Sequence, residues 1–97
     1  MFELAWTHEA EETYQVLKGD LSQLKRYKAV KKTIQFLAKN PRHNSLQTHE
    51  YSSLEGPHGE KVFEAYAEQN TPAAYRVFWY YGPSKGIITI IAITPNP

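Results

Sequence analysis

The residues best suited to chemistry lie in an apolar run near the end of the sequence, Tyr75-Arg76-Val77-Phe78-Trp79-Tyr80-Tyr81. Because side chains alternate across a strand, Arg76, Phe78 and Tyr80 are predicted to share one face. A guanidinium does not lose its charge in proteins, so it must meet a partner, an anion or water. We expect one face of this strand to belong to the core. The other would display a fixed positive charge between two aromatic rings, a surface suited to phosphate and bases.

Further polar groups precede this strand. Residues 61–68 alternate in polarity, which predicts a second strand whose Glu64 shares the face of Arg76. His49 and His58 lie in the polar segment before it, and histidine is the residue type that exchanges protons most readily near neutral pH. Plainer alternatives stay open, because Glu64 and Arg76 could form only an ion pair between strands and the histidines could be ordinary loop residues.

The composition predicts one ordinary globular domain over residues 1–97, with 41% hydrophobic and 22% charged residues. The absence of cysteine excludes disulfides and thiol chemistry. No apolar run approaches the ~20 residues of a membrane span, so we expect a cytoplasmic protein without a membrane contact. The histidines show no short ligand pairing, and no glycine-rich phosphate loop or nucleophile elbow occurs. We therefore expect neither a metal nor a cofactor.

The net charge of +1 conceals a strong segregation of charge along the chain. Residues 18–42 hold eight basic side chains and one acidic, a sum of +7, whereas the rest holds three basic and nine acidic, a sum of −6. A basic element of this kind is typical of a surface that binds nucleic acid or an acidic protein. A solvated helix face is the alternative.

The coarse pattern predicts how these groups are positioned. Residues 2–6 alternate like a short strand, Thr7 is placed as an N-cap, and residues 8–17 form a helix. A second helix, starting at residue 20 or 21 and ending at Asn40-Pro41, has an apolar stripe. The stripe comprises Leu21, Leu24, Tyr27, Val30, Ile34 and Leu37.

Residues 42–59 have no clear period and are predicted to form a long loop, anchored by Leu46, Tyr51 and Leu54. After it come the strands described above and a last strand over residues 87–93. The order β-α-α-β-β-β predicts an α+β fold, in which a two-helix hairpin packs on one face of a mainly antiparallel four-stranded sheet.

In this order the chain resembles the RelE/ParE superfamily, toxins of bacterial type II toxin–antitoxin systems. The resemblance covers nearly the whole chain and is carried by several short segments. These are Phe2-Glu3-Leu4-Ala5-Trp6-Thr7, Asn40-Pro41-Arg42-His43, Leu46 and Leu54, Phe63-Glu64-Ala65, Ala74-Tyr75-Arg76-Val77-Phe78 and Ile90-Ile91-Ala92-Ile93.

The resemblance implies one of two activities. RelE-like members cut mRNA, commonly in the ribosomal A site and without metal, and so inhibit translation. ParE-like members inhibit DNA gyrase and have no nuclease centre. Both kinds are silenced by a cognate antitoxin. Two further alternatives stay open: the chain could be a degenerate member that retains only binding contacts, and it could form a homodimer.

For a nuclease, a base must take the proton of a ribose 2′-hydroxyl, a cation must neutralise the phosphate, and an acid must protonate the leaving 5′-oxygen. Arg76 matches the arginine that the family uses to hold phosphate. Glu64 lies near the family's base or lysine, so the resemblance implies Glu64 or His49 as base and His58 or His49 as acid.

Other predicted RNA contacts are lysines and aromatic rings. The lysines, expected on the RNA backbone, are Lys25, Lys28, Lys31, Lys32 and Lys61. Tyr66, Phe78 and Tyr80 could stack on bases, although core packing or an antitoxin interface explains them as well.

The sequence departs from the family at its end. Many RelE-like nucleases end the last strand with a basic residue, often followed by a tyrosine, whereas this chain has Thr94-Pro95-Asn96-Pro97. We therefore expect the usual general acid to be absent, so that either a loop histidine replaces it or the protein does not cut RNA.

Overall fold

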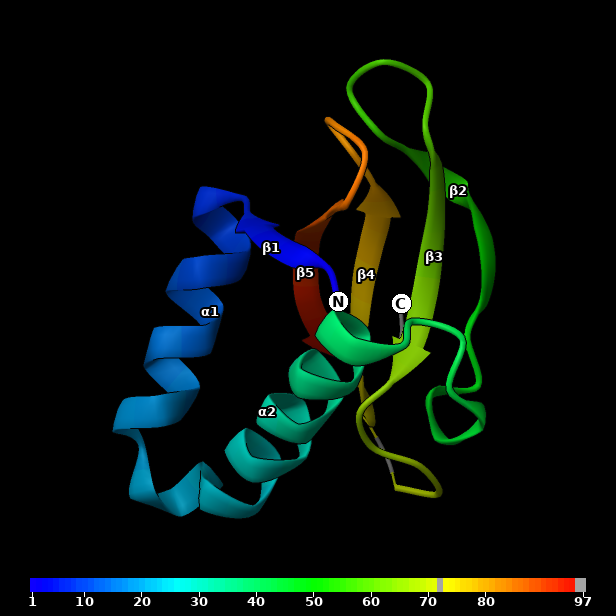
Figure 1. Cartoon of the computed structure of the whole chain (residues 1–97). Coiled ribbons are helices and arrows are strands. Elements are labelled where there is room, and N and C mark those ends of the chain that lie inside the picture. The colour runs from blue at the N-terminus through cyan, green and yellow to red at the C-terminus, as the bar shows by residue number, and fades with distance from the viewer. Residues whose placement is uncertain (72, 96–97) are drawn as a thin grey trace.

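A mixed five-stranded sheet, with strand order β1-β5-β4-β3-β2, carries two α-helices on one face in this computed structural model (Figure 1). The structure describes residues 1–71 and 73–95. The strands are β1 (Glu3–Trp6), β2 (His49–Glu55), β3 (Lys61–Tyr66), β4 (Tyr75–Tyr81) and β5 (Ile87–Pro95), and the helices are α1 (His8–Gly19) and α2 (Leu24–Lys39). Within the described residues, no helix is long and apolar enough to cross a membrane.

The sheet pairing confirms the predicted mainly antiparallel order. β3 pairs antiparallel with β2 and β4, and β4 with β5, whereas β1 pairs parallel with β5. A parallel neighbour requires a crossover, and the two helices supply it between β1 and the antiparallel strands. The fold class predicted from the sequence is thus confirmed.

The core lies between the helices and one sheet face. Val77 and Trp79 of β4 are fully buried there, together with Phe63 and Ala65 of β3. The alternation of β3 and β4 therefore places their side chains as predicted, with Glu64 and Arg76 on the opposite face.

The second helix begins later than expected. A 3₁₀ helix (Leu21–Gln23) follows Asp20, whose carboxylate accepts a hydrogen bond from the Ser22 backbone amide at 3.0 Å, and α2 starts only at Leu24. Leu21 and Leu24 are consequently 85% and 44% exposed, so their predicted place in the buried stripe is wrong. The hydrogen bonds from Ser22 also hold the pKa of Asp20 below its ordinary value.

The prediction of four strands misses β2, which lies within the predicted loop over residues 42–59. β2 is an edge strand, and most of its side chains are exposed, so it lacks the alternation that marks a half-buried strand. Of the predicted anchors, Leu46 is 1% exposed, whereas Leu54 is 41% exposed. Tyr51 is partly buried and packs against Phe78, so Leu46 and Tyr51 are confirmed as anchors and Leu54 is not.

Thr7 joins the start of α1 to β5. Its Oγ1 accepts a hydrogen bond from the Ala10 amide at 3.1 Å and donates one to the Ile91 carbonyl at 2.7 Å. We expect Thr7→Val to lower the free energy of unfolding by about 1–2 kcal/mol, because it removes the cap and leaves a carbonyl unpaired. Urea unfolding measures this, with Thr7→Ser as the matched control that keeps the hydroxyl. Equal stability of both variants would contradict the prediction.

Candidate functional site

The sheet face opposite the helices brings together His49, Glu64, Tyr66 and Arg76. His49 is directly opposite Glu64 in the β2–β3 register, and Tyr66 is directly opposite Arg76 in the β3–β4 register. Directly opposed residues project from the same face of a sheet. The expectation that Glu64 and Arg76 share a face is therefore confirmed, and β2 adds one of the two candidate histidines.

His49 and Glu64 form a close ion pair. The Nε2 of His49 lies 2.6 Å from Glu64 Oε1, and the His49 side chain is 48% exposed whereas that of Glu64 is 5% exposed. The other ring nitrogen, Nδ1, lies 3.1 Å from the Gln47 carbonyl oxygen. A carboxylate and a carbonyl are acceptors only, so both contacts are favourable together when both ring nitrogens carry protons. The pair thus presents a half-exposed proton donor held on a buried carboxylate.

Arg76 is held from several sides. Its guanidinium carbon lies 3.9 Å from the centroid of the Tyr66 ring, and its Nη1 donates to the Glu68 carbonyl at 3.1 Å and the Ala74 carbonyl at 3.3 Å. The residue is 9% exposed. The expectation that this strand displays a free positive charge is therefore wrong, because the aromatic ring and the two carbonyls enclose the charge.

Arg76 and Glu64 face each other without a hydrogen bond. Their closest atoms, Nε and Oε2, are 3.9 Å apart, and both are buried without a hydrogen-bond partner among the described residues. Unpaired polar atoms are costly in a low-dielectric interior. The pair therefore places an unsatisfied donor beside an unsatisfied acceptor, both shielded from solvent.

Sequence reasoning missed Arg26 and Glu68, which fix the turn between β3 and β4. Arg26 Nε lies 2.9 Å from Glu68 Oε1, which also accepts from the Tyr75 amide at 3.0 Å. The Arg26 guanidinium lies 4.4 Å from the Tyr75 ring centroid. Because the Glu68 carbonyl also binds Arg76, this ion pair supports the position of Arg76 from α2. No local pattern could have paired two residues so far apart in sequence.

Two aromatic candidates are enclosed rather than displayed. Phe78 is 1% and Tyr80 is 6% exposed, and Tyr51 of β2 packs edge-on against Phe78 with ring centroids 4.9 Å apart. A ring stacks on a base only through an open face, so the structure assigns both to packing. Tyr66 is only partly buried.

His58 lies away from the cluster, in the turn between β2 and β3, at the end of β3 opposite Tyr66 (Figure 1). At the rise of an extended strand, Glu60 lies about 13 Å along the chain from Glu64. The His58 amide donates to Glu60 Oε1 at 2.8 Å, and this hydrogen bond holds the pKa of Glu60 below its ordinary value. The structure therefore does not bring His58 to Glu64 and Arg76.

The predicted lysine contacts are exposed but lie on another side of the molecule. Those of α2, on the helical side of the sheet, are Lys25, Lys28, Lys31 and Lys32. Lys61 is exposed in β3, with its Nζ 3.8 Å from Glu50 Oε1. Among residues 1–71 and 73–95, no group of three histidine or acidic side chains is arranged to hold a metal ion. Asn96 and Pro97, two of the four final residues at which the sequence differs from many RelE-like nucleases, lie outside the described residues.

Comparison with known proteins establishes the fold. No protein-family model matches the chain, and no curated protein sequence matches it significantly. Among solved structures, the chain is similar to a YoeB/ParE toxin from Agrobacterium tumefaciens, with a TM-score of 0.71, 11% identity and coverage of 99% of this chain and 100% of that one.

Two further structures agree. A YoeB dimer from Staphylococcus aureus matches with a TM-score of 0.63 and 11% identity, covering 99% of this chain and 98% of that one. The intact E. coli RelBE toxin–antitoxin complex matches with a TM-score of 0.62 and 11% identity, covering 100% of this chain and 99% of that one. The chain therefore shares the arrangement of its sheet and helices with these toxin structures over nearly the whole of each chain.

Proposed function

We propose that this chain is the toxin of a type II toxin–antitoxin system and acts as a metal-independent mRNA endoribonuclease that inhibits translation. The observation that carries this proposal is the cluster of His49, Glu64 and Arg76 on one sheet face. It joins a proton donor, a carboxylate and a fixed cation, which are the groups that RNA cleavage by the 2′-hydroxyl requires. The RelE/ParE fold supports the same conclusion by analogy.

The geometry favours one assignment of roles. Glu64 takes the proton of the 2′-hydroxyl as its oxygen attacks phosphorus. The charge of Arg76, although mostly enclosed at 9% exposure, lies beside Glu64 and stabilises the negative charge that builds on the phosphate. His49, the exposed member, gives a proton to the leaving 5′-oxygen. The products are a 2′,3′-cyclic phosphate and a 5′-hydroxyl. Proton transfer across the 2.6 Å contact between Glu64 and His49 then restores both groups. His58 has no part in this scheme.

We further propose a cognate antitoxin and mRNA, on the ribosome or free, as partners in the cytoplasm. One structural neighbour is a toxin–antitoxin complex and another is a dimer, which supports antitoxin binding and makes self-association of this chain worth measuring.

A second function, inhibition of DNA gyrase without catalysis, is favoured by one observation. The contacts of Arg76 with Tyr66, Glu68 and Ala74 are those of a structural arginine. A supercoiling assay with purified gyrase tests this alternative. A family member that only binds other proteins would show neither activity.

The test of the main proposal is inducible expression in bacteria with mapping of mRNA 5′ ends, wild type beside Arg76→Lys. We expect growth arrest with new 5′-hydroxyl mRNA ends in the wild type and fewer such ends in the variant, because lysine keeps the charge but restores only part of the activity. Arrest without new mRNA ends would replace the nuclease with another target, and no arrest would favour a binding-only protein.

The lysines of α2 supply a separate prediction about RNA affinity. Replacing Lys25, Lys28 and Lys31 with glutamine should weaken single-stranded RNA binding and flatten its salt dependence. The slope of log K against log salt should fall in magnitude by about 0.7 for each phosphate that is no longer neutralised, or about 2 for three phosphates. Lys85→Gln, an exposed lysine in the β4–β5 turn, is the control. An unchanged slope would mean that the lysines of α2 bind a partner other than RNA.

A further inference from the structure

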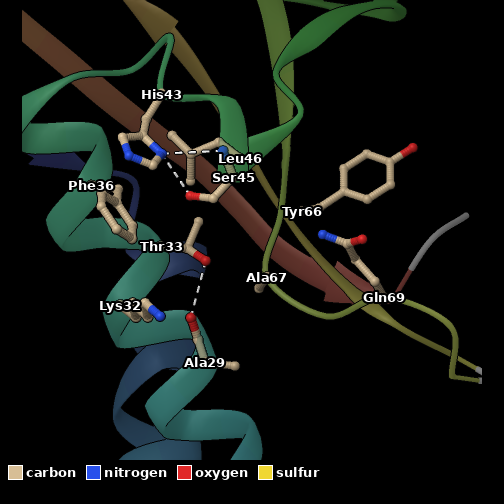
Figure 2. Close-up of a pocket in the computed structure, with 10 residues that line it drawn as sticks. All are labelled: Ala29, Lys32, Thr33, Phe36, His43, Ser45, Leu46, Tyr66, Ala67 and Gln69. Atoms are coloured by element: carbon tan, nitrogen blue, oxygen red, sulfur yellow. Dashed lines mark hydrogen bonds between the residues drawn. The ribbon is translucent and has the colours of Figure 1, made fainter.

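A groove runs between α2 and the end of β3 (Figure 2). Its volume is about 530 Å³. Thr33 of α2, Leu46 and Ala67 line it with small or apolar groups, while Lys32, His43 and Gln69 bring polar ends to it. This groove is distinct from the cluster of His49, Glu64 and Arg76.

One wall of the groove is aromatic. The rings of Phe36 and His43 are stacked, with centroids 4.4 Å apart and an interplanar angle of 26°. Lys32 Nζ lies 5.8 Å from the Phe36 ring centroid, within range of a cation–π contact. Both rings are partly buried. The two rings cover each other's inner faces, so the stack fixes the orientation of the His43 ring and leaves the edge of that ring to contact a ligand.

Three of the polar groups that line the groove present hydrogen-bond donors, while the hydroxyls of Thr33, Ser45 and Tyr66 can donate or accept. The Nδ1 of His43 accepts from the Ser45 backbone amide at 3.1 Å, so in the neutral ring the proton is on Nε2, which is left to donate. Gln69 Oε1 accepts from Gln47 Nε2 at 3.3 Å, which directs its other end, the amide nitrogen, toward α2 (Figure 2).

The ammonium of Lys32 is also a donor, and no carboxylate lines the groove among the described residues. A ligand that matches these groups is rich in acceptors and negatively charged. A nucleobase with its phosphate has both properties, because bases present carbonyl oxygens and ring nitrogens.

The groove adjoins the candidate site through Tyr66. This residue lines the groove, its ring lies under the Arg76 guanidinium at 3.9 Å, and it meets the His49 ring edge-on with centroids 5.6 Å apart. An RNA chain bound to Arg76 could therefore reach the groove by passing around the end of β3 at Tyr66, toward the exposed lysines of α2.

We infer that this groove binds a nucleobase of single-stranded RNA that flanks the cleaved phosphate, and so contributes to the choice of cleavage site. His43 Nε2 and the Gln69 amide contact the edge of the base, while Phe36 stacks on His43 and holds its ring in position. Lys32 binds the adjoining phosphate. This inference rests on the proposed nuclease function and extends it to sequence preference.

The test measures binding of 2′-O-methyl oligonucleotides of uridine, cytidine and adenosine, which cannot be cleaved, to wild type and to groove variants. His43→Phe keeps the ring and removes its donor, and Gln69→Leu removes the amide. We expect each to weaken the preferred homopolymer about five- to tenfold and to reduce the differences among the three. The Gln69 side-chain amide resonances should also shift on titration of the wild type. Gln35→Leu, at an exposed position of α2 outside the groove, is the matched control for Gln69→Leu.

The outcomes separate this inference from the function on which it rests. If the wild type cleaves RNA but both groove variants keep its affinity and preference, the groove proposal fails and the nuclease stands. If the variants lose only antitoxin affinity, the groove binds a protein segment and the proposal also fails. If the wild type neither binds nor cleaves RNA, both proposals fall together.

Discussion

Replacing Arg76 with alanine should slow RNA cleavage at least about 100-fold, because removing one preorganised donor from a site of developing charge costs about 10²–10³ in rate. Arg76→Lys should recover only part of this activity. Lysine keeps the charge but cannot stack flat on Tyr66 while donating to the Glu68 and Ala74 carbonyls. Single-turnover cleavage of a defined RNA by the purified proteins measures both effects.

The stability of the Arg76 variants must be measured beside their activity. Arg76→Ala removes one of the two basic groups beside the buried carboxylate of Glu64 and leaves His49 as the other, and breaking a buried ion pair destabilises proteins by about 3–5 kcal/mol. The effect should lie at the lower end, because the pair is separated by 3.9 Å. The double variant Arg76→Met with Glu64→Leu removes both charges and should recover stability without activity. A folded Arg76→Ala protein that cleaves like the wild type would refute the arginine-centred site.

The second large effect is expected at His49. His49→Gln should reduce cleavage by about 10²–10⁴, the usual contribution of a positioned acid or base. Its effect on stability should be small, since the side chain is 48% exposed. Glu64→Gln should reduce cleavage similarly, and because residues that act as a unit are not additive, the double variant should be little worse than either single one.

His58→Gln is the matched control for His49→Gln. Both histidines are exposed and lie beside an acidic residue, but His58 pairs with Glu60 at 3.8 Å in the distant turn. We expect its cleavage rate to match the wild type. Loss of activity in His58→Gln with full activity in His49→Gln would reverse the assignment and require RNA to reach the turn between β2 and β3.

The sequence alone was sufficient to predict those features of the fold that depend on local periodicity. The N-cap at Thr7, the burial of Val30, Ile34 and Leu37, and the shared face of Glu64 and Arg76 all follow from the helical and strand repeats. A period of two assigns each strand residue to a face without knowledge of what lies opposite. That is why the sequence alone could pair the candidate carboxylate with the candidate cation.

Only the tertiary structure decided what surrounds these residues. β2 is stabilised mainly by pairing with β3 and not by burial, so its sequence carries little period, yet it delivers His49 to Glu64 and Tyr51 to Phe78. The enclosure of Arg76 by Tyr66 and the Glu68 carbonyl likewise depends on contacts between strands and on the Arg26 ion pair from α2. Such contacts join distant parts of the chain, and no local pattern in the sequence encodes them.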